Sequence, residues 1–286
     1  MNNSYKYSLD RTSKKFVCPN CHKKTFVKFI DKETKHYLND IDGRCDRESK
    51  CGYFKKPSNN ICITNNNNSI TTVIQPTYHS KDIAVKYCDT LQQSSFISYL
   101  LSTFSVKSVI QAIKTYNIGI TNYWQGATIF WQIDTKKKIR GGKIMLYNCN
   151  TGKRVKQPYN HVSWMHKQLK LDNFVLQQCL FGLHQINNIS KDDTICIVES
   201  EKTAVIMSIV IPNFLWLATG SKTGFKKEML QPIKEYKVIA YPDKTEYKSW
   251  NEKAILLNKE GFTIQCSSLL ESLDLKEGCD LVDFLL

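Results

Sequence analysis

The stretch "CIVESEKTAV", residues 196–205, decides how the second half of this chain folds. Its first residues are apolar and include two β-branched side chains, which favours a buried strand. The apolar run resumes at Ala204, which is typical of a helix that follows the strand directly. Charged residues occupy the junction, with Glu199 at the end of the strand and Glu201 and Lys202 in the first turn of the helix. The junction is therefore a candidate functional site.

The same alternation continues on both sides of the junction, from about residue 193 to the end of the chain. We expect strands at 194–200, 214–219, 237–243 and 262–268, and helices at 201–211, 226–236 and 246–261. Strands that alternate with helices through short connections predict a parallel sheet covered by helices. The predicted fold class is therefore α/β for this part of the chain.

Two acidic residues end strands of this predicted sheet. Glu199 ends the first strand and Asp243 ends the third. The carboxyl ends of parallel strands meet at one edge of a sheet, so these carboxylates converge and form a site that suits Mg²⁺. The alternative is that Glu199 and Glu201 only stabilise the N-terminus of the following helix through its dipole.

Composition and charge narrow the classes of partner. The 286 residues carry a formal net charge of +14, which favours a polyanionic partner, nucleic acid first and an acidic membrane surface second. A simply lysine-rich, solvated surface is the alternative. The N-terminal residues 1–16 lack the apolar region of a signal peptide, and no run of about 20 apolar residues could span a bilayer. We therefore expect a cytoplasmic protein without a membrane partner.

Four of the eleven cysteines are clustered near the N-terminus. Cys18 and Cys21 form one pair, and Cys45 and Cys51 form a second pair, with an alternating segment between them. Two thiolate pairs on either side of a hairpin predict a structural Zn²⁺ site in a zinc ribbon that spans 1–57. His22 and His36 lie close enough in sequence to replace one thiolate.

The ribbon is basic and contains interleaved aromatic residues, which is typical of a surface that binds single-stranded nucleic acid. Lys23 and Arg47 are our candidates for contacts with nucleic acid. Residues 58–79 are rich in Asn, Ser and Thr and predict a linker, with a loose strand possible at 61–63 or 71–74.

A middle segment, 80–192, separates the linker from the α/β part that we assign to 193–286. Helices are predicted to start at Ser80, Ser94 and Ser105, and the last of them to end at Gly119. Strands at 126–134 and 141–155 follow. The hairpin that they form is the second basic patch, with candidate nucleic-acid contacts at Lys136, Arg140, Lys143 and Arg154.

Four motifs occur in the order found in the Toprim domain, which primases, topoisomerases and related nucleases share. They are "IVESEKTAVI" (197–206), "LATGSKTGF" (217–225), "VIAYPDKTEYKSWNEKA" (238–254) and "GCDLVDFLL" (278–286). Upstream, "CLFGLHQI" (179–186) and the strand pair resemble elements of bacterial primases, and the zinc ribbon completes that layout. The resemblance covers about 16–57 and 125–286, and implies a zinc ribbon and a primase-like core that ends in a Toprim parallel sheet.

The resemblance also implies roles for individual residues. Glu199 matches the catalytic glutamate, Asp243 the first acid of the Asp-x-Asp motif, and Asp280 the terminal acid, so that Glu199, Asp243 and Asp280 would hold catalytic Mg²⁺ or Mn²⁺. Lys143 matches a basic position that contacts template or nucleotide, and Lys202 is placed to meet a phosphate.

The match departs from the family pattern in two places. Thr245 replaces the second acid of Asp-x-Asp, with Glu246 one position later, where the loop could still bring it in. Ser200 replaces the glycine that usually follows the catalytic glutamate.

Taken together, the sequence predicts a primase-like nucleotidyltransferase that acts on single-stranded DNA or RNA with NTPs, in replication of a phage, plasmid or other mobile element. A helicase or another replication protein is the expected partner. The first alternative is a catalytically degenerate module that binds DNA or RNA, which the missing acid favours. A Toprim nuclease is the lesser alternative.

Overall fold

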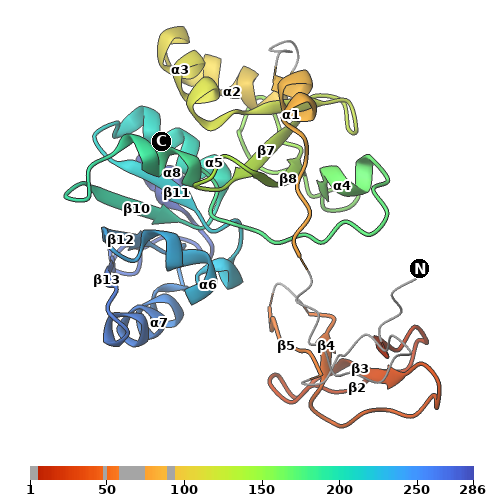
Figure 1. Cartoon of the computed structure of the whole chain (residues 1–286). Coiled ribbons are helices and arrows are strands. Elements are labelled where there is room, and N and C mark those ends of the chain that lie inside the picture. Colours follow the sequence, from red (N-terminus) through yellow and green to blue (C-terminus); the bar gives the residue numbers. More distant parts are fainter. Residues whose placement is uncertain (1–5, 48–49, 58–74, 89–93) are drawn as a thin grey trace. The chain divides into compact units, whose positions relative to one another are not determined.

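The computed structural model describes residues 6–47, 50–57, 75–88 and 94–286, which fall into two units, Met1–Val73 and Ile74–Leu286. Both are drawn in Figure 1. Most of the expected linker, including both loose strands considered there, lies outside the described residues. The domain boundaries at 57, 79 and 192 therefore stay predictions. None of the helices in the described ranges combines the length and the apolar character needed to cross a lipid bilayer.

The first unit is an antiparallel ribbon built on one long strand. Its strands are β1 (Tyr7–Leu9), β2 (Phe16–Val17), β3 (Lys24–Asp31), β4 (Gly43–Cys45) and β5 (Phe54–Lys55). They pair in the order β1-β3-β4-β5, and β2 also pairs with β3. Gly43 is needed where β4 pairs with β3, because a Cβ there would lie 2.3 Å from the Val27 carbonyl oxygen. The core is small: Cys18, Phe26 and Cys45 are its fully buried residues among those described.

The second unit begins with an antiparallel sheet covered by helices. The helices are α1 (Lys81–Cys88), α2 (Ser95–Thr103), α3 (Val106–Tyr116) and α4 (Met165–Gln168). The strands β6 (Gly119–Thr121), β7 (Ala127–Ile133), β8 (Ile139–Met145) and β9 (Val162–Trp164) pair in chain order. The predicted caps at Ser94 and Ser105 are confirmed, since each side chain accepts a hydrogen bond from the first turn of its helix.

One predicted helix end was wrong. Helix α3 ends at Tyr116, and Asn117 caps it in the left-handed conformation, with a φ of 52°. Asparagine adopts this conformation more readily than most other residues with a side chain, so the chain turns two residues earlier than expected. Gly119 instead begins β6.

The C-terminal part is the predicted parallel sheet. Its strands are β10 (Thr194–Val198), β11 (Leu215–Ala218), β12 (Lys237–Tyr241) and β13 (Thr263–Cys266), in the order β11-β10-β12-β13. Its α-helices are α5 (Glu201–Val210), α6 (Lys227–Leu230), α7 (Tyr247–Lys259) and α8 (Leu281–Leu285). Three 3₁₀ turns lie between these elements or before them, at Leu183–Asn188, Lys222–Gly224 and Gln231–Ile233.

Both faces of this sheet are buried. Cys196 and Val198 of β10 pack in one cluster with residues of α2, α3 and α5. Ile195 and Ile197 pack in a second cluster with residues of α6 and α7. Figure 1 labels these two helices and the strands of the sheet. Burial of both faces explains why the strand reads as a continuous apolar run. It also leaves the strand ends as the place where polar residues can gather.

Candidate functional site

The strand order fixes where a crevice forms. Strand β10 pairs with β11 on one side and with β12 on the other. The connection after β10 therefore leads to one side of it, and the connection after β11 crosses to the other side. Connections that leave in opposite directions open a crevice beyond the carboxyl ends of the two central strands. Glu199 follows β10 directly, and Asp243 follows β12 after Pro242. Both acids therefore stand at this topological switch point.

A cavity of about 670 Å³ occupies the crevice, and Glu199 and Asp243 both line it. Six basic residues also line it: Lys143, Lys153, Arg154, Lys156, Lys202 and Lys276. The remaining acids that line it are Glu201, Glu277, Asp280 and Asp283. The cavity thus combines carboxylates that can hold a metal ion with ammonium and guanidinium groups that can hold phosphates.

The two strand-end acids, Glu199 and Asp243, lie where a negative charge is unfavourable. Burial raises the pKa of Asp243 to about 9, and the charges of Glu199, Asp280, Glu246 and Asp283 add to that rise. Burial also raises the pKa of Glu199, helped by the charge of Glu246, while a hydrogen bond from the Lys222 backbone N–H lowers it. Carboxylates that repel one another in a partly buried crevice favour either a proton or a cation.

Glu201 has a different environment from Glu199, although both belong to the opening stretch. It is 1% exposed, and its carboxylate lies 3.0 Å from the Lys143 ammonium. Lys143 also donates a hydrogen bond of 2.6 Å to the carbonyl oxygen of Gly220. This ion pair ties β8 to α5 and to the loop after β11. No local sequence pattern indicates this pair, because the partners are 58 residues apart.

Asp280 is engaged by its own helix and by α5. One carboxylate oxygen caps α8 by accepting hydrogen bonds from the backbone N–H groups of Val282 and Asp283. The other accepts a 2.5 Å hydrogen bond from the Thr203 hydroxyl and lies 3.7 Å from the Lys202 ammonium. A metal ion at Asp280 would therefore have to displace Thr203 or Lys202.

The basic residues predicted to bind nucleic acid divide between two places. Lys143 and Arg154 line the crevice with Glu199 and Asp243. Lys136 and Arg140 instead line a second cavity of about 250 Å³. There the Arg140 guanidinium donates to the Asp134 carboxylate at 2.7 Å.

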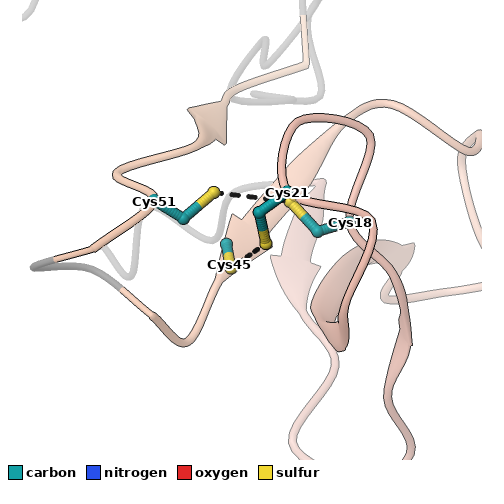
Figure 2. A group of neighbouring side chains, drawn as sticks. All are labelled: Cys18, Cys21, Cys45 and Cys51. Atoms are coloured by element: carbon teal, nitrogen blue, oxygen red, sulfur yellow. Dashed lines mark hydrogen bonds between the residues drawn. The ribbon is translucent and has the colours of Figure 1, made fainter.

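In the ribbon, the four cysteines converge (Figure 2). Their Sγ atoms all lie within 4.8 Å of one another, with Cys18 3.7 Å from Cys51 and Cys21 3.9 Å from Cys45. A backbone hydrogen bond from Lys23 lowers the pKa of Cys21, which favours the thiolate that a metal needs. Four soft sulfur donors in this arrangement fit Zn²⁺.

The structure describes the other predicted residues of the ribbon as well. His22 and His36 are exposed, and the potential metal ligands found together among the described residues of the ribbon are the cysteines alone. Lys23 is exposed, and the Arg47 carbonyl oxygen accepts a hydrogen bond from the backbone N–H of Cys51.

Two family models match the chain. A model described as a domain of unknown function (DUF6371) matches residues 94–244, and a zinc β-ribbon finger model matches residues 5–68. The predicted zinc ribbon is thereby confirmed, and the clustered cysteines support a structural Zn²⁺. No curated protein matches the chain.

Among solved structures, the chain is similar to primase cores. The RNA polymerase domain of Mycobacterium tuberculosis primase DnaG is 12% identical, with a TM-score of 0.48 over 71% of this chain and 76% of that chain. The primase fragment of the bacteriophage T7 primase-helicase is 13% identical, with a TM-score of 0.43 over 92% and 91%. The E. coli primase catalytic core is 16% identical, with a TM-score of 0.44 over 70% and 73%. Primases are the class that the sequence resembles.

Proposed function

The chain belongs to the family described as a domain of unknown function (DUF6371), and we propose that it is a primase-like nucleic-acid-binding protein. The finer proposal is that it joins NTPs into a primer on single-stranded template, with Mg²⁺ or Mn²⁺, in replication of a phage or other mobile element. One observation carries it: Glu199 and Asp243 share a cavity at the switch point of the sheet, together with Arg154 and other basic residues.

The donor set of the crevice fits a hard divalent cation. Glu199 and Asp243 offer carboxylate oxygens. Burial raises the pKa of each and neighbouring acids add to the rise, so a cation would relieve their repulsion. A divalent cation bound there would neutralise the charge that develops on a transferring phosphoryl group. Glu199 and Asp243 are the residues that would hold it.

The basic residues of the cavity would orient the phosphates. Lys153, Arg154 and Lys156 line it from the segment between β8 and β9. Lys202, which the resemblance places to meet a phosphate in the catalytic site, lines the cavity and lies 3.7 Å from Asp280. We propose that it also keeps the α8 cap in place beside the substrate. Lys143 is paired with Glu201, so we propose that it positions the crevice more than it contacts template.

The ribbon would supply the grip on the single strand. Lys23 and other exposed lysines offer charges for phosphates, and rings such as Phe54, which is 49% exposed, offer faces for stacking. Lys136 and Arg140 would extend the basic surface of the second unit. A helicase or another replication protein remains the proposed partner.

A template-dependent synthesis assay tests the proposal. Full-length protein is incubated with single-stranded DNA, the four NTPs and Mg²⁺ or Mn²⁺, and labelled products are resolved by length. We expect E199A and D243N each to lower synthesis at least 100-fold, because each removes a ligand needed only for chemistry. The control E235A changes an exposed carboxylate on the surface and should leave synthesis unchanged.

A second candidate function is a catalytically degenerate module, which Thr245 in place of the second acid favours. That module would bind single strands without chemistry. Its affinity would fall steeply with salt and would not respond to E199A or to removal of Mg²⁺. Absence of synthesis by the wild-type chain, combined with this binding behaviour, would replace the first proposal with the second. Nicking of plasmid DNA with Mn²⁺ would point to a nuclease instead.

A further inference from the structure

Four aromatic side chains of the second unit lie together, although they come from two separate segments of the chain. Tyr123 and Trp124 precede β7, and Tyr159 and His161 precede β9. The ring centroids of Tyr123 and Trp124 are 4.6 Å apart. The His161 ring lies 5.0 Å from Trp124 and 4.5 Å from Tyr159. The four rings therefore form one continuous group, which we call the aromatic platform.

Two rings of the aromatic platform are exposed to solvent. Tyr159 is 55% exposed and Tyr123 is 46% exposed, whereas His161 is buried. The Tyr159 ring stacks on His161 at an interplanar angle of 23°, so the face turned away from His161 is the open one. Single exposed aromatic rings are common on protein surfaces, but a group of them marks a surface that a ligand can cover.

The backbone around the aromatic platform fixes its rings. The His161 backbone N–H donates a 3.3 Å hydrogen bond to the Val155 carbonyl oxygen, and the His161 Nδ1 lies 3.2 Å from the same oxygen. Trp124 packs against a buried cluster that includes residues of β7 and β8, and its carbonyl oxygen accepts a 2.8 Å hydrogen bond from the Ala127 N–H. Because the rings are already held in place, little conformational freedom would be lost when a ligand stacks on them.

Three basic residues precede Tyr159 in the same segment. Lys153, Arg154 and Lys156 are exposed, and all three line the crevice cavity. Among the described residues, none of the three forms an ion pair with a carboxylate. A protein partner with an apolar surface would cover the rings but leave these charges unmatched. Charge complementarity therefore favours a polyanion that also offers flat rings, which is a nucleic acid with unpaired bases.

We propose that the aromatic platform stacks unpaired bases of single-stranded DNA, while Lys153, Arg154 and Lys156 hold the phosphates of the same strand beside the crevice. The proposal rests on the function proposed above, because it names the surface of the second unit that would hold the template strand. The bases of a duplex are stacked on one another, so the aromatic platform would favour a single strand over a duplex.

The alternative is that the four rings only pack the β8–β9 connection against the segment before β7. The two views differ at residue 159. If Tyr159 serves packing alone, an aliphatic side chain of similar size would replace it without effect on DNA binding. If Tyr159 stacks a base, the replacement must keep a flat aromatic face.

Fluorescence anisotropy with the zinc-loaded full chain and a labelled thymidine oligonucleotide distinguishes these views without any assay of synthesis. We expect Y159L to weaken binding about fivefold or more, and Y159F to bind within about twofold of wild type, because a base stacks on the ring and not on the hydroxyl. An oligonucleotide of the same length without bases should bind Y159L and wild type equally. The matched control is F214L, which changes a ring that is 38% exposed and does not line the crevice; it should bind like wild type.

The salt dependence separates the rings from the charges. The triple variant K153Q/R154Q/K156Q should reduce the slope of the logarithm of the binding constant against the logarithm of the salt concentration by about two, because three phosphate contacts are lost. Y159L should leave that slope unchanged, since stacking releases no counterions. Far-UV circular dichroism and thermal unfolding verify that each variant is folded.

Photo-crosslinking locates the contact directly. An oligonucleotide that carries 5-iodouracil is irradiated on the wild-type chain, and we expect a crosslink at Tyr159 or Tyr123. Crosslinks confined to residues 1–57, or unchanged affinity in Y159L combined with weaker binding by the triple variant, would overturn the aromatic platform and leave the proposed nucleic-acid binding standing. Failure of the wild-type chain to bind single-stranded DNA at all would instead refute the proposed function.

Discussion

The ribbon brings four thiols together and the crevice brings several carboxylates together, but the stability of the two regions depends on these groups in opposite ways. In the ribbon, two of the four cysteines, Cys18 and Cys45, belong to a core whose third fully buried member is Phe26. The crevice stands on a sheet whose two faces are each covered by a large apolar cluster. The ribbon therefore needs its ligands in order to fold, whereas the crevice can carry acids that repel one another.

In the crevice, unlike the ribbon, residues of the same chemical type have different roles. Its acids divide by partner: Glu201 is paired with Lys143 and Asp280 caps α8, while Glu199 and Asp243 repel each other. Residues of one chemical type thus serve either the fold or the site. The environment of each carboxylate, and not its identity, decides which.

The largest effect should follow loss of one cysteine ligand. We expect C45S to lose zinc and, with it, the ordered structure of residues 7–55, because zinc binding contributes about 10–16 kcal/mol to the folding of small zinc domains. Zinc content by atomic absorption and amide protection by hydrogen exchange check this. C149S, at an exposed cysteine of the second unit, is the control. Protected amides in a zinc-free ribbon would show that the ribbon folds without its metal, against the contrast drawn above.

The next effect tests the crevice. E201Q should destabilise the second unit by about 3–5 kcal/mol, because it leaves the buried Lys143 ammonium without its counterion. All five tryptophans lie in Ile74–Leu286, so fluorescence during urea unfolding reports on this unit alone.

The matched control is E235Q, which removes an ion pair whose partners are both 69% exposed and should cost less than about 1 kcal/mol. The apolar double variant K143M/E201L should recover much of the loss, since neither charge is then left unpaired. If E201Q and E235Q lower the free energy of unfolding equally, Glu201 is not the structural acid of the crevice.

The sequence predicted what depends on short spacing and could not predict what depends on distant partners. The cysteine pairs, the strand–helix alternation and the caps at Ser94 and Ser105 are local patterns, and each is confirmed. The roles of Glu199 and Asp243 follow from the sheet order and stay a proposal. The Lys143–Glu201 pair joins residues 58 positions apart, so no local pattern could reveal it.

A buried histidine of the second unit gives a further buried polar group to compare with the crevice acids. His79 is 5% exposed, stacks on Phe174 with ring centroids 4.6 Å apart, and has no hydrogen-bond partner for either ring nitrogen among the described residues. Burial lowers the pKa of His79 to about 4, and the charge of His166 adds to the shift. His79 is therefore neutral in the folded chain.

The sign of the pH effect follows from this shift. The unfolded chain binds the proton near pH 6.5 and the folded chain only near pH 4, so stability is full above 6.5 and falls by up to about 3 kcal/mol as pH drops to 4. His166 and His184 add to the fall with the same sign. H79Q should flatten the pH dependence measured by urea unfolding, while H36Q should not. An unchanged slope in H79Q would mean that the buried ring is not the source.

The smallest effect concerns Thr245, in the loop that leads from β12 to α7. Thr245 is β-branched and holds a positive φ of 78°, which costs roughly 1–2 kcal/mol. Glycine relieves this strain but gains freedom in the unfolded chain, so T245G should raise the stability of the second unit by only about 0.5–1 kcal/mol. T263G, on an exposed residue of β13, should lower stability by a similar amount and serves as the control. If T245G is instead the less stable protein, Thr245 contributes contacts that outweigh its backbone strain, and the turn into α7 depends on its side chain.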